Sequence, residues 1–332
     1  MSHRVRIADV AREAGVSTQT VSRVLNEKGE VSQATRQTVL EVIKRLGYRP
    51  SGIARGLVTD RTLTIGLVVP DISNPFFSEI ARSAEDLVWE KGYTVILCNT
   101  MENQEREAAI LQVLEDKRVD GLILCSGRLP DDRLLPLLKR HRTSVSVNRQ
   151  LPDAIAATVL TDDAYGTMQA VHHLLAKQRR TIGFLAGPPT SRSGWERSRG
   201  LAAALESAGH PMDPTLSVPC LPYVEGGYHA ARTLLSAHPE IDGLICYNDL
   251  VAVGALQACA ELGRRVPDDV SVVGCDDIPL ARLVTPPLTT LRVSRHEIAS
   301  RAVSMLFDRM QSHDEQGTII LKPELIVRAS AP

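Results

Sequence analysis

Residues 7–25 read IADVAREAGVSTQTVSRVL and predict two short helices joined by a tight turn. The first helix carries an apolar stripe at the i, i+3, i+4, i+7 spacing, through Ile7, Val10, Ala11 and Ala14. Gly15 ends this helix, because glycine tolerates the backbone of a tight turn. Ser17 is placed to accept a hydrogen bond from an orphan amide at the start of the second helix. Two helices with such a turn are the parts of a helix-turn-helix.

The second helix, expected at 18–25, has one apolar and one polar face. Val21, Val24 and Leu25 would be buried, and the outward face carries Thr18, Gln19, Ser22, Arg23 and Asn26. Arg can bond guanine and Gln can bond adenine in the major groove, while hydroxyls and helix amides suit phosphates. A small helical bundle with a solvated polar face has the same periodicity, so both interpretations stay open on these residues alone.

A third helix is expected after Ser32, which is placed to cap it. Gly47 would end this helix, and its inward side would hold Val39, Leu40, Ile43 and Leu46. The next stretch, RPSGIARGL at 49–57, reads as a linker, because Pro50 has no amide to donate and the glycines weaken a helix.

The charges are divided unevenly along the chain. Residues 1–60 hold ten Lys and Arg against six Asp and Glu, whereas the rest of the chain holds 28 against 33. A basic head on an acidic body indicates different partners for the two parts. The 332 residues, 43% apolar and 23% charged, exclude a disordered or fibrous chain and suit two or three domains.

Strands and helices alternate from residue 62 onward. Short apolar runs predict buried strands at 63–69, 94–98 and 119–125, and helical patterns lie between them at 77–92 and 106–118. This order of strand, helix and strand is typical of a parallel sheet.

The same order of elements occurs a second time. Three pairs of runs match: TIGLVVP at 64–70 with TIGFLAGP at 181–188, VDGLILC at 119–125 with IDGLICY at 241–247, and TSVSVN at 143–148 with VSVVGCD at 270–276. Two copies of one α/β unit predict two similar lobes. Since ligands of open α/β sheets bind beyond the carboxyl ends of the strands, we expect a cleft that the two lobes share.

Polar and aromatic side chains follow the ends of these strands. They are Asp71, Ser73, Asn74, Phe76, Phe77, Asn148, Arg149, Asp162, Asp163, Ser191, Ser193, Arg197, Asn248, Asp249, Asp276 and Asp277. Carboxylates accept hydroxyl protons, Arg donates in a fixed fork and a ring covers an apolar sugar face, so the set suits a polyol. Taken singly, each polar residue could merely cap a helix or form a turn, whereas convergence on one cleft favours a binding site.

The head resembles the DNA-binding head of the lac repressor (LacI) family. The shared pattern is D-V-A-x-x-A-G-V-S-x-x-T-V-S-R-V-L-N, followed by V-S-x-x-T-R and L-G-Y-x-P. The resemblance implies that Thr18, Gln19 and Arg23 read bases, with further DNA contacts from Thr20, Ser22, Asn26, Ala54 and Leu57. It also implies that 49–61 form a hinge helix that folds on operator DNA, where Leu57 wedges into the minor groove.

The body resembles the same family along its whole length, and beyond it the periplasmic sugar-binding protein fold. The matching strings are IGLVVPDISNPFFSEI, KRVDGLILC, YNDLVAVGAL, GRRVPDDVSVVGCDD and TPPLTTLRV. The resemblance implies an α/β fold, with an all-α helix-turn-helix head and a two-lobed body of doubly wound parallel sheets. Its effector contacts fall on Phe76, Phe77, Asn148, Asp162, Ser193, Arg197, Tyr223, Asn248 and Asp276.

The expected domains follow from this resemblance. The DNA-binding head would span 1–48, the hinge 49–61, and the effector-binding and dimerisation body 62–332. Within the body, lobe 1 would comprise about 62–162 and 292–321, and lobe 2 about 163–290 and 323–332.

Other classes of protein lack the motifs that they need. The chain has no G-x-G-x-x-G after a strand, no phosphate-binding loop, no G-x-S-x-G and no H-E-x-x-H, so we expect neither an enzyme nor a cofactor. The nine His and six scattered Cys show no metal-ligand spacing, so we expect no metal site and no disulfide. A secreted sugar-binding protein would need a signal peptide, and MSHRVRIADV has no apolar core. We therefore expect a cytoplasmic protein without a membrane span.

The sequence thus predicts a repressor of carbohydrate-utilisation genes, whose affinity for operator DNA is switched by an effector between the lobes. A homodimer is expected because pseudo-palindromic operators mirror two-fold protein symmetry. Asp162 and Asp276 outnumber Arg197, so a neutral monosaccharide or small oligosaccharide ranks first as effector, a sugar acid second, and a purine or sugar phosphate third.

Overall fold

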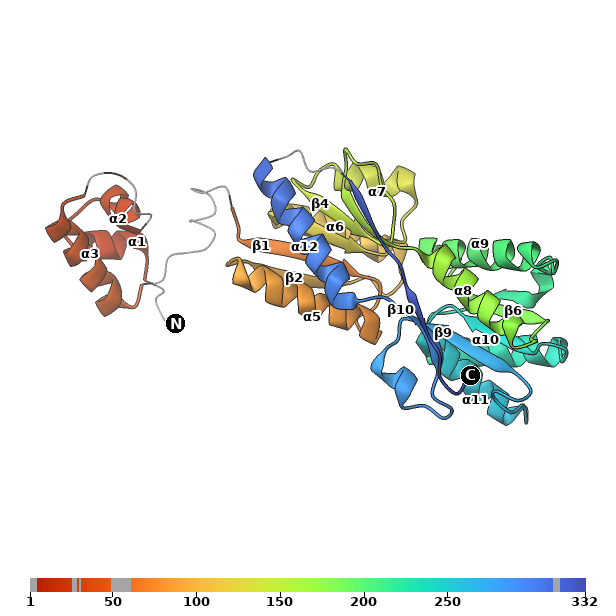
Figure 1. Cartoon of the computed structure of the whole chain (residues 1–332). Coiled ribbons are helices and arrows are strands. Elements are labelled where there is room, and N and C mark those ends of the chain that lie inside the picture. The colour runs from red at the N-terminus through yellow and green to blue at the C-terminus, as the bar shows by residue number, and fades with distance from the viewer. Residues whose placement is uncertain (1–4, 26–28, 30, 49–60, 313–316) are drawn as a thin grey trace. The chain divides into compact units, whose positions relative to one another are not determined.

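The computed structural model describes residues 5–25, 29, 31–48, 61–312 and 317–332. The chain divides into two compact units, 1–62 and 63–332. The first unit is helical and the second is built from α/β elements (Figure 1).

The head is a bundle of three helices: α1 (Ile7–Glu13), α2 (Thr18–Leu25) and α3 (Gln33–Leu46). The predicted helix ends are confirmed. At the starts of α2 and α3, Ser17 Oγ accepts from the Thr20 amide at 3.1 Å and Ser32 Oγ accepts from the Thr35 amide at 3.2 Å. After the ends of α1 and α3, Gly15 and Gly47 each have φ of 64°. The core consists of Val10, Ala11, Val21, Val24, Val39 and Val42.

Leu40 was wrongly expected in that core. Its side chain is 49% exposed, and Val42 is buried instead. The inward stripe of α3 runs through Val39, Val42, Ile43 and Leu46, which has helical spacing, and Leu40 lies about 100° round the helix from Val39.

Lobe 1 is a six-stranded sheet with the order β11-β5-β4-β3-β1-β2, and every neighbouring pair is parallel. Its strands are β1 (Thr64–Val69), β2 (Thr94–Asn99), β3 (Gly121–Cys125), β4 (Ser144–Val147), β5 (Ala157–Thr161) and β11 (Thr318–Leu321). Helices α5 (Pro75–Glu90) and α12 (Arg295–Ser312) cover one face, and α6 (Gln104–Asp116) and α7 (Asp131–Leu138) cover the other. Because both faces are covered, the strands read as continuous apolar runs.

Lobe 2 repeats this plan with the order β12-β10-β9-β8-β6-β7. Its strands are β6 (Ile182–Gly187), β7 (Ser217–Pro219), β8 (Gly243–Cys246), β9 (Ser271–Cys275), β10 (Thr289–Arg292) and β12 (Glu324–Ile326). Helices α10 (Val224–Ala237) and α11 (Asp249–Glu261) cover one face, and α8 (Asp163–Ala176) and α9 (Arg192–Ser207) cover the other. Lobe 2 also contains two short 3-10 helices, η1 (Pro214–Leu216) and η2 (Pro279–Arg282). The strands of the matching sequence runs, β1 and β6, β3 and β8, β4 and β9, hold equivalent positions, which confirms the predicted duplication.

The two sheets differ at one edge. β5 pairs with β11 in parallel, whereas β10 pairs with β12 antiparallel, so the expected parallel sheet of lobe 2 carries one antiparallel edge strand. The cause is that β11 and β12 are consecutive along one crossing segment, which meets β5 and β10 from opposite ends.

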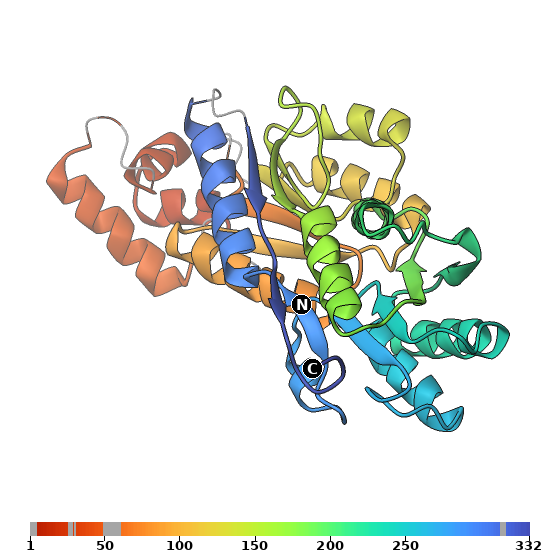
Figure 2. The ribbon, with the colours of Figure 1, turned by 45° about the vertical axis from the view of Figure 1, so that its right-hand side comes forward.

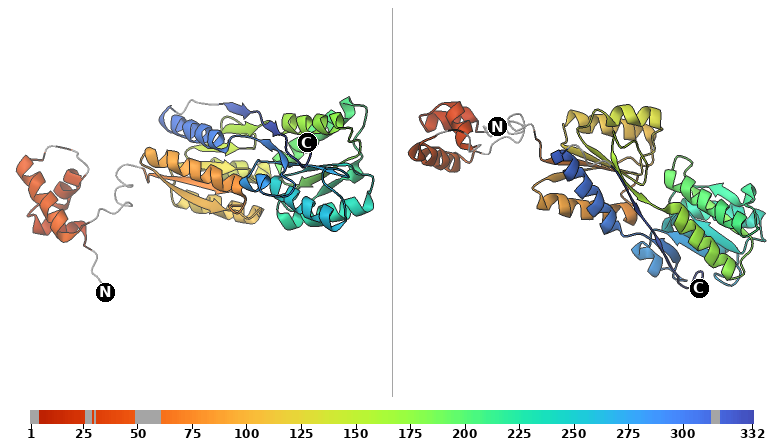
Figure 3. Two further views of the ribbon diagram at one scale, coloured as in Figure 1. Left: turned by 60° about the horizontal axis from the view of Figure 1, so that its bottom comes forward. Right: turned by 45° about the horizontal axis from the view of Figure 1, so that its top comes forward.

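The chain passes between the lobes three times: after β5, after β10 and between β11 and β12 (Figures 1 and 3). The second crossing follows Arg292, because the whole of β10 pairs within the lobe 2 sheet before α12 packs on lobe 1. The chain ends in lobe 2 (Figure 2), where Ser330 Oγ donates to the Val272 carbonyl at 2.6 Å.

Candidate functional site

The second helix of the head, α2, presents a polar face at the surface. Thr18, Gln19 and Arg23 are exposed, and Thr20 and Ser22 are half-buried. The Ser17 hydroxyl binds both the amide and the hydroxyl of Thr20, at 3.1 and 3.0 Å, and so fixes the first turn of α2. Asn26, Ala54 and Leu57, together with residues 49–60 of the expected hinge, lie outside the described residues.

A cavity lies between the lobes, where the carboxyl ends of strands from both sheets meet. Its volume is about 420 Å³, counting the part that is open to solvent. Eight of the nine residues expected around an effector line it: Phe76, Phe77, Asn148, Ser193, Arg197, Tyr223, Asn248 and Asp276. Because these residues follow β1, β4, β6, β7, β8 and β9, the sheet topology brings them together.

Asp162 is the expected residue that does not line this cavity. Its carboxylate caps α8 by accepting from the Tyr165 amide at 3.1 Å, and the side chain borders a neighbouring chamber instead. The strand-end position predicts a ligand contact, whereas the Asp162 carboxylate caps α8 and lies outside this cavity.

Arg197 is held rigidly at the wall of the cavity. Its guanidinium binds Asp163 at 2.8 Å, donates to the Tyr247 carbonyl and stacks on the Tyr247 ring at 5.0 Å. Burial lowers the pKa of Arg197. The neighbouring Asp163 carboxylate outweighs this effect, and the pKa is raised well above its ordinary value. A charged donor in a fixed orientation therefore faces the cavity.

Asp276 is the carboxylate opposite this guanidinium. It is buried, and burial raises its pKa to about 7, against the opposing effect of Arg197. Its backbone has φ of 115°, and its amide donates to the Leu291 carbonyl at 2.8 Å. The loop geometry thus directs a carboxyl group with an unusual pKa into the cavity.

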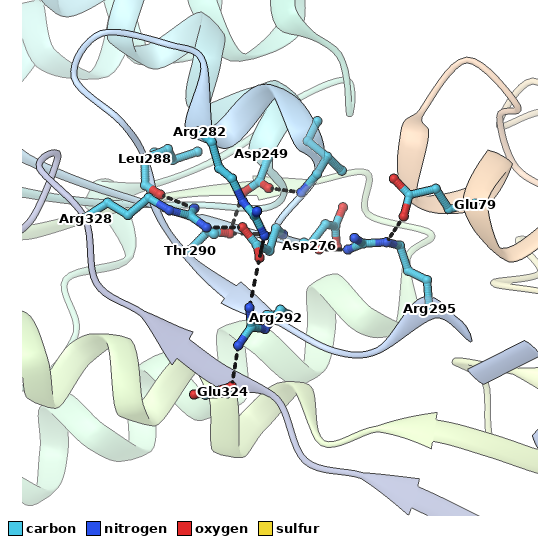
Figure 4. A network of polar contacts seen from close by, with 12 residues as sticks. Glu79, Asp249, Asp276, Arg282, Leu288, Thr290, Arg292, Arg295, Glu324 and Arg328 are labelled. Carbon is cyan, nitrogen blue, oxygen red and sulfur yellow. Dashed lines mark hydrogen bonds and ion pairs between the residues drawn. The ribbon is translucent and has the colours of Figure 1, made fainter. Parts of the chain in front are cut away.

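The loop that carries Asp276 is fastened by an ion-pair network (Figure 4). Asp277 is fully buried and binds Arg328 at 2.5 Å, with two further guanidinium groups, those of Arg282 and Arg292, at 3.5 and 3.7 Å. Asp277 was a candidate from its strand-end position, but these contacts make it a structural residue.

Arg295, at the start of α12, joins the same loop to the other lobe. It donates to the Asp276 carbonyl at 2.5 Å and to Glu79 of α5 at 2.5 Å (Figure 4). Any change in the angle between the lobes must therefore move or break a contact at Asp276.

The two asparagines of the cavity also have structural contacts. Asn248 Oδ1 caps α11 by accepting from the Val251 amide at 2.8 Å, and Asn148 Oδ1 accepts from the Thr161 amide at 3.1 Å. The structural interpretation of strand-end residues is therefore confirmed at these two positions, and both residues also line the cavity.

Sequence reasoning missed two charged residues of the cavity. The buried Arg128 and the partly buried Glu102 line it as a pair, joined by hydrogen bonds of 2.5 and 3.0 Å. Arg128 also donates to the Tyr247 hydroxyl of lobe 2 at 3.4 Å. Arg128 lies just beyond β3, and Glu102 lies just beyond β2. The strand-end rule finds both residues when it is applied to these two strands.

Among the described residues, no group of three or more His, Cys, Asp and Glu side chains is arranged to hold a metal ion. None of the helices in the described ranges is both long enough and apolar enough to cross a membrane.

Comparison with known proteins decides the family. Residues 6–51 match the model for bacterial regulatory proteins of the lacI family, and residues 171–331 match a periplasmic binding protein-like domain. The HTH-type transcriptional regulator RegA of Clostridium saccharobutylicum is 37% identical, and the alignment covers 98% of each chain. The ribose operon repressor of Halalkalibacterium halodurans is 37% identical over 92% of this chain and 90% of its own.

The chain belongs to the lacI family.

Solved structures of this family share the fold. A lac repressor dimer bound to operator and the anti-inducer ONPF superposes with a TM-score of 0.85 at 27% identity, covering 99% of both chains. The transcriptional regulator CelR in complex with cellobiose gives 0.74 at 32% identity, covering 98% of this chain and all of its own. The expected fold, a helical head with two α/β lobes, is confirmed, and this lacI-family member is a DNA-binding transcriptional regulator.

Proposed function

We propose that the protein represses carbohydrate-utilisation genes and that a small sugar in the cavity between the lobes switches its affinity for operator DNA. In this proposal residues 1–48 read the operator, 49–61 form the hinge, and the body binds the effector and a second copy of the chain. The chain then acts as a switch without catalysis, and its place is the cytoplasm, where bacterial DNA lies.

One observation carries the effector part of the proposal. Polar groups from both lobes and four aromatic rings, those of Phe76, Phe77, Tyr223 and Tyr247, converge on one cavity of about 420 Å³, counting the part that is open to solvent. Because side chains of both lobes would touch one ligand, binding would favour one angle between the lobes, and a ligand shifts an equilibrium only by such differential contact.

The charges of the cavity favour a neutral sugar. Arg128 and Arg197 are both paired with carboxylates, so neither guanidinium is left over for a phosphate. Asp276 can accept sugar hydroxyls, and the rings can cover an apolar sugar face. The ribose operon repressor and the cellobiose complex of CelR, two similar proteins, support a sugar by their names. A sugar acid stays second, and a purine or sugar phosphate third.

The DNA part of the proposal makes Arg23 a base-reading residue. Its exposed position on α2 suits bidentate bonding to guanine in the major groove, and two heads in a homodimer suit a pseudo-palindromic site. The lac repressor dimer on its operator, a similar protein, supports this arrangement.

The test of the DNA part uses an operator selected by the wild-type protein from random duplexes. We expect Arg23→Ala to weaken binding to that operator by about 1–3 kcal/mol and to leave binding to a random duplex nearly unchanged. Arg45→Ala is the matched control, because Arg45 lies on α3 in an exposed pair with Glu13 and should cost little. Equal losses on operator and random DNA would show that Arg23 contacts only phosphates.

The test of the effector part is a thermal-shift screen against sugars, sugar acids, sugar phosphates and purines. A ligand at 100 times its dissociation constant should stabilise the body by about 2.7 kcal/mol. If a purine or phosphorylated sugar binds far more tightly than every neutral sugar, the charge argument is wrong.

A further inference from the structure

A second chamber adjoins the cavity between the lobes. It has a volume of about 960 Å³, counting the part that is open to solvent, and Asn148 and Ser193 line both spaces. We call it the outer chamber and define it by Asp131, Asp162, Arg192, Trp195, Glu196 and Arg199, all of which line it. The two spaces are therefore neighbours in the same cleft, and a ligand that reaches from one to the other would pass Asn148 and Ser193.

Trp195 supplies the outer chamber with a large apolar surface. It lies in the first turn of α9 and is 60% exposed, which is unusual for an indole that packs in a core. The Arg199 guanidinium lies 5.7 Å from the ring centroid and is itself held by Glu196 at 2.5 and 3.0 Å. This support orients the indole while most of its surface stays open.

The rim around Trp195 is polar and comes from both lobes. Asp131 of lobe 1 lies 3.5 Å from Arg192 of lobe 2, and both side chains are about half exposed. The Asp162 carboxylate, which lies outside the inner cavity, borders this chamber. An open indole among carboxylates and guanidinium groups is the combination that holds a sugar ring, because the ring stacks by its apolar face and binds by its hydroxyls.

We propose that the outer chamber is a second sugar subsite, and that the effector has two linked sugar rings, one in the inner cavity and one stacked on Trp195. This inference rests on the proposed function and narrows its ligand to disaccharides and similar glycosides. Linking the rings matters because the second contact becomes intramolecular once the first ring is bound, so the two contacts reinforce each other.

The first experiment measures binding of the effector-free protein to matched sugars by calorimetry. The one-ring probes are glucose, galactose and xylose, and the two-ring probes are cellobiose, maltose, lactose and xylobiose. We expect one two-ring sugar to bind at least tenfold more tightly than its component ring. Trp195→Ala should remove about tenfold of that affinity, equivalent to about 1.4 kcal/mol, and should change one-ring binding less than twofold.

Trp89→Ala is the matched control. Trp89 is 68% exposed on α5 and lines neither the inner cavity nor the outer chamber, so its loss should change neither class of affinity. Equal thermal stability of the two variants would show that a loss of binding does not come from unfolding.

The second experiment uses fluorescence. The chain has two Trp residues, so Trp89→Phe leaves Trp195 as the single indole. A two-ring sugar should shift its emission to shorter wavelength and protect it from acrylamide, and a one-ring sugar should do neither.

Two results would overturn the subsite. One is that no two-ring sugar binds; the other is that Trp195→Ala leaves two-ring affinity intact. If one-ring sugars still bind, the proposed sugar-switched function stands while the subsite falls. If no sugar of either size binds, the sugar class of the proposed function falls as well.

Discussion

Asp276 concentrates the chemistry of the inner cavity in one carboxyl group. Burial raises its pKa to about 7, Arg197 and Arg295 act to lower that pKa, and Asp163 acts to raise it further. Since an ordinary Asp titrates near 4, this group changes charge close to neutral pH. An ionised carboxylate accepts hydroxyl protons on both oxygens, whereas the protonated form offers fewer acceptor sites.

Effector affinity should therefore rise with pH through about 7. We expect a sugar that binds the wild type to bind more tightly at pH 8 than at pH 6, as measured by calorimetric titration at both values. Asp276→Asn should flatten this dependence and weaken binding by about 1–3 kcal/mol, because hydroxyls lose a charged acceptor. An unchanged slope in Asp276→Asn would assign the titration to another group.

The stability of the effector-free protein should respond to the same carboxyl group. Between pH of about 4 and 7 the folded state holds this proton more firmly than the unfolded state does, because the folded pKa is raised. The contribution of Asp276 to stability is therefore present at low pH and is lost as pH rises through about 7. The free energy of unfolding in urea, measured between pH of about 4 and 7, should therefore fall with rising pH more steeply in the wild type than in Asp276→Asn.

Helices α10 and α11 pack through glycine. A Cβ atom at Gly254 would lie 2.0 Å from the Val224 carbonyl oxygen, and one at Gly227 would lie 2.2 Å from the Val251 carbonyl oxygen. These distances are far below contact, so only glycine allows the two backbones to approach this closely. The crossing also fixes the start of α11, where Asn248 faces the cavity.

Gly254→Ala should consequently destabilise lobe 2, although alanine normally favours a helix. We expect a loss of about 1–3 kcal/mol or more in urea unfolding, because the methyl group meets backbone atoms that cannot rotate away. Gln257→Ala, at an exposed position of the same helix, should stay within about 0.5 kcal/mol of wild type. A neutral Gly254→Ala would mean that the helices separate without cost.

The proposed function couples two binding sites of the molecule, the effector cavity in the body and the DNA-binding head. Coupling free energies are reciprocal. If the effector changes the affinity for operator by some factor, the operator must change the affinity for effector by the same factor. We expect a factor of about 5–150, with affinity falling for an inducer and rising for a corepressor. Effector titrations with and without operator duplex measure it, and Arg23→Ala with the same duplex is the control. Identical effector affinities in both titrations would show that the cavity and the head are uncoupled.

Local patterns in the sequence determined the elements and their duplication. The apolar stripes and caps of residues 7–47 predicted α1, α2 and α3, because helix ends depend on nearby side chains such as Ser17, Ser32 and Gly47. The repeated apolar runs predicted two like sheets, because strands that are buried on both faces have a recognisable composition.

Tertiary structure decided how residues far apart in the chain are used. Asp162, Asp276 and Asp277 all follow strands, yet one caps a helix, one faces the cavity and one is enclosed by three guanidinium groups. The pairing of Arg128 with Glu102 depends on the order of strands in the lobe 1 sheet. The antiparallel edge of β12 and the position of Trp195 in the outer chamber depend on how the chain connects the two lobes. A sequence pattern records what a residue can bind, but its partner is set by long-range packing, to which the neighbouring residues in the chain give no guide.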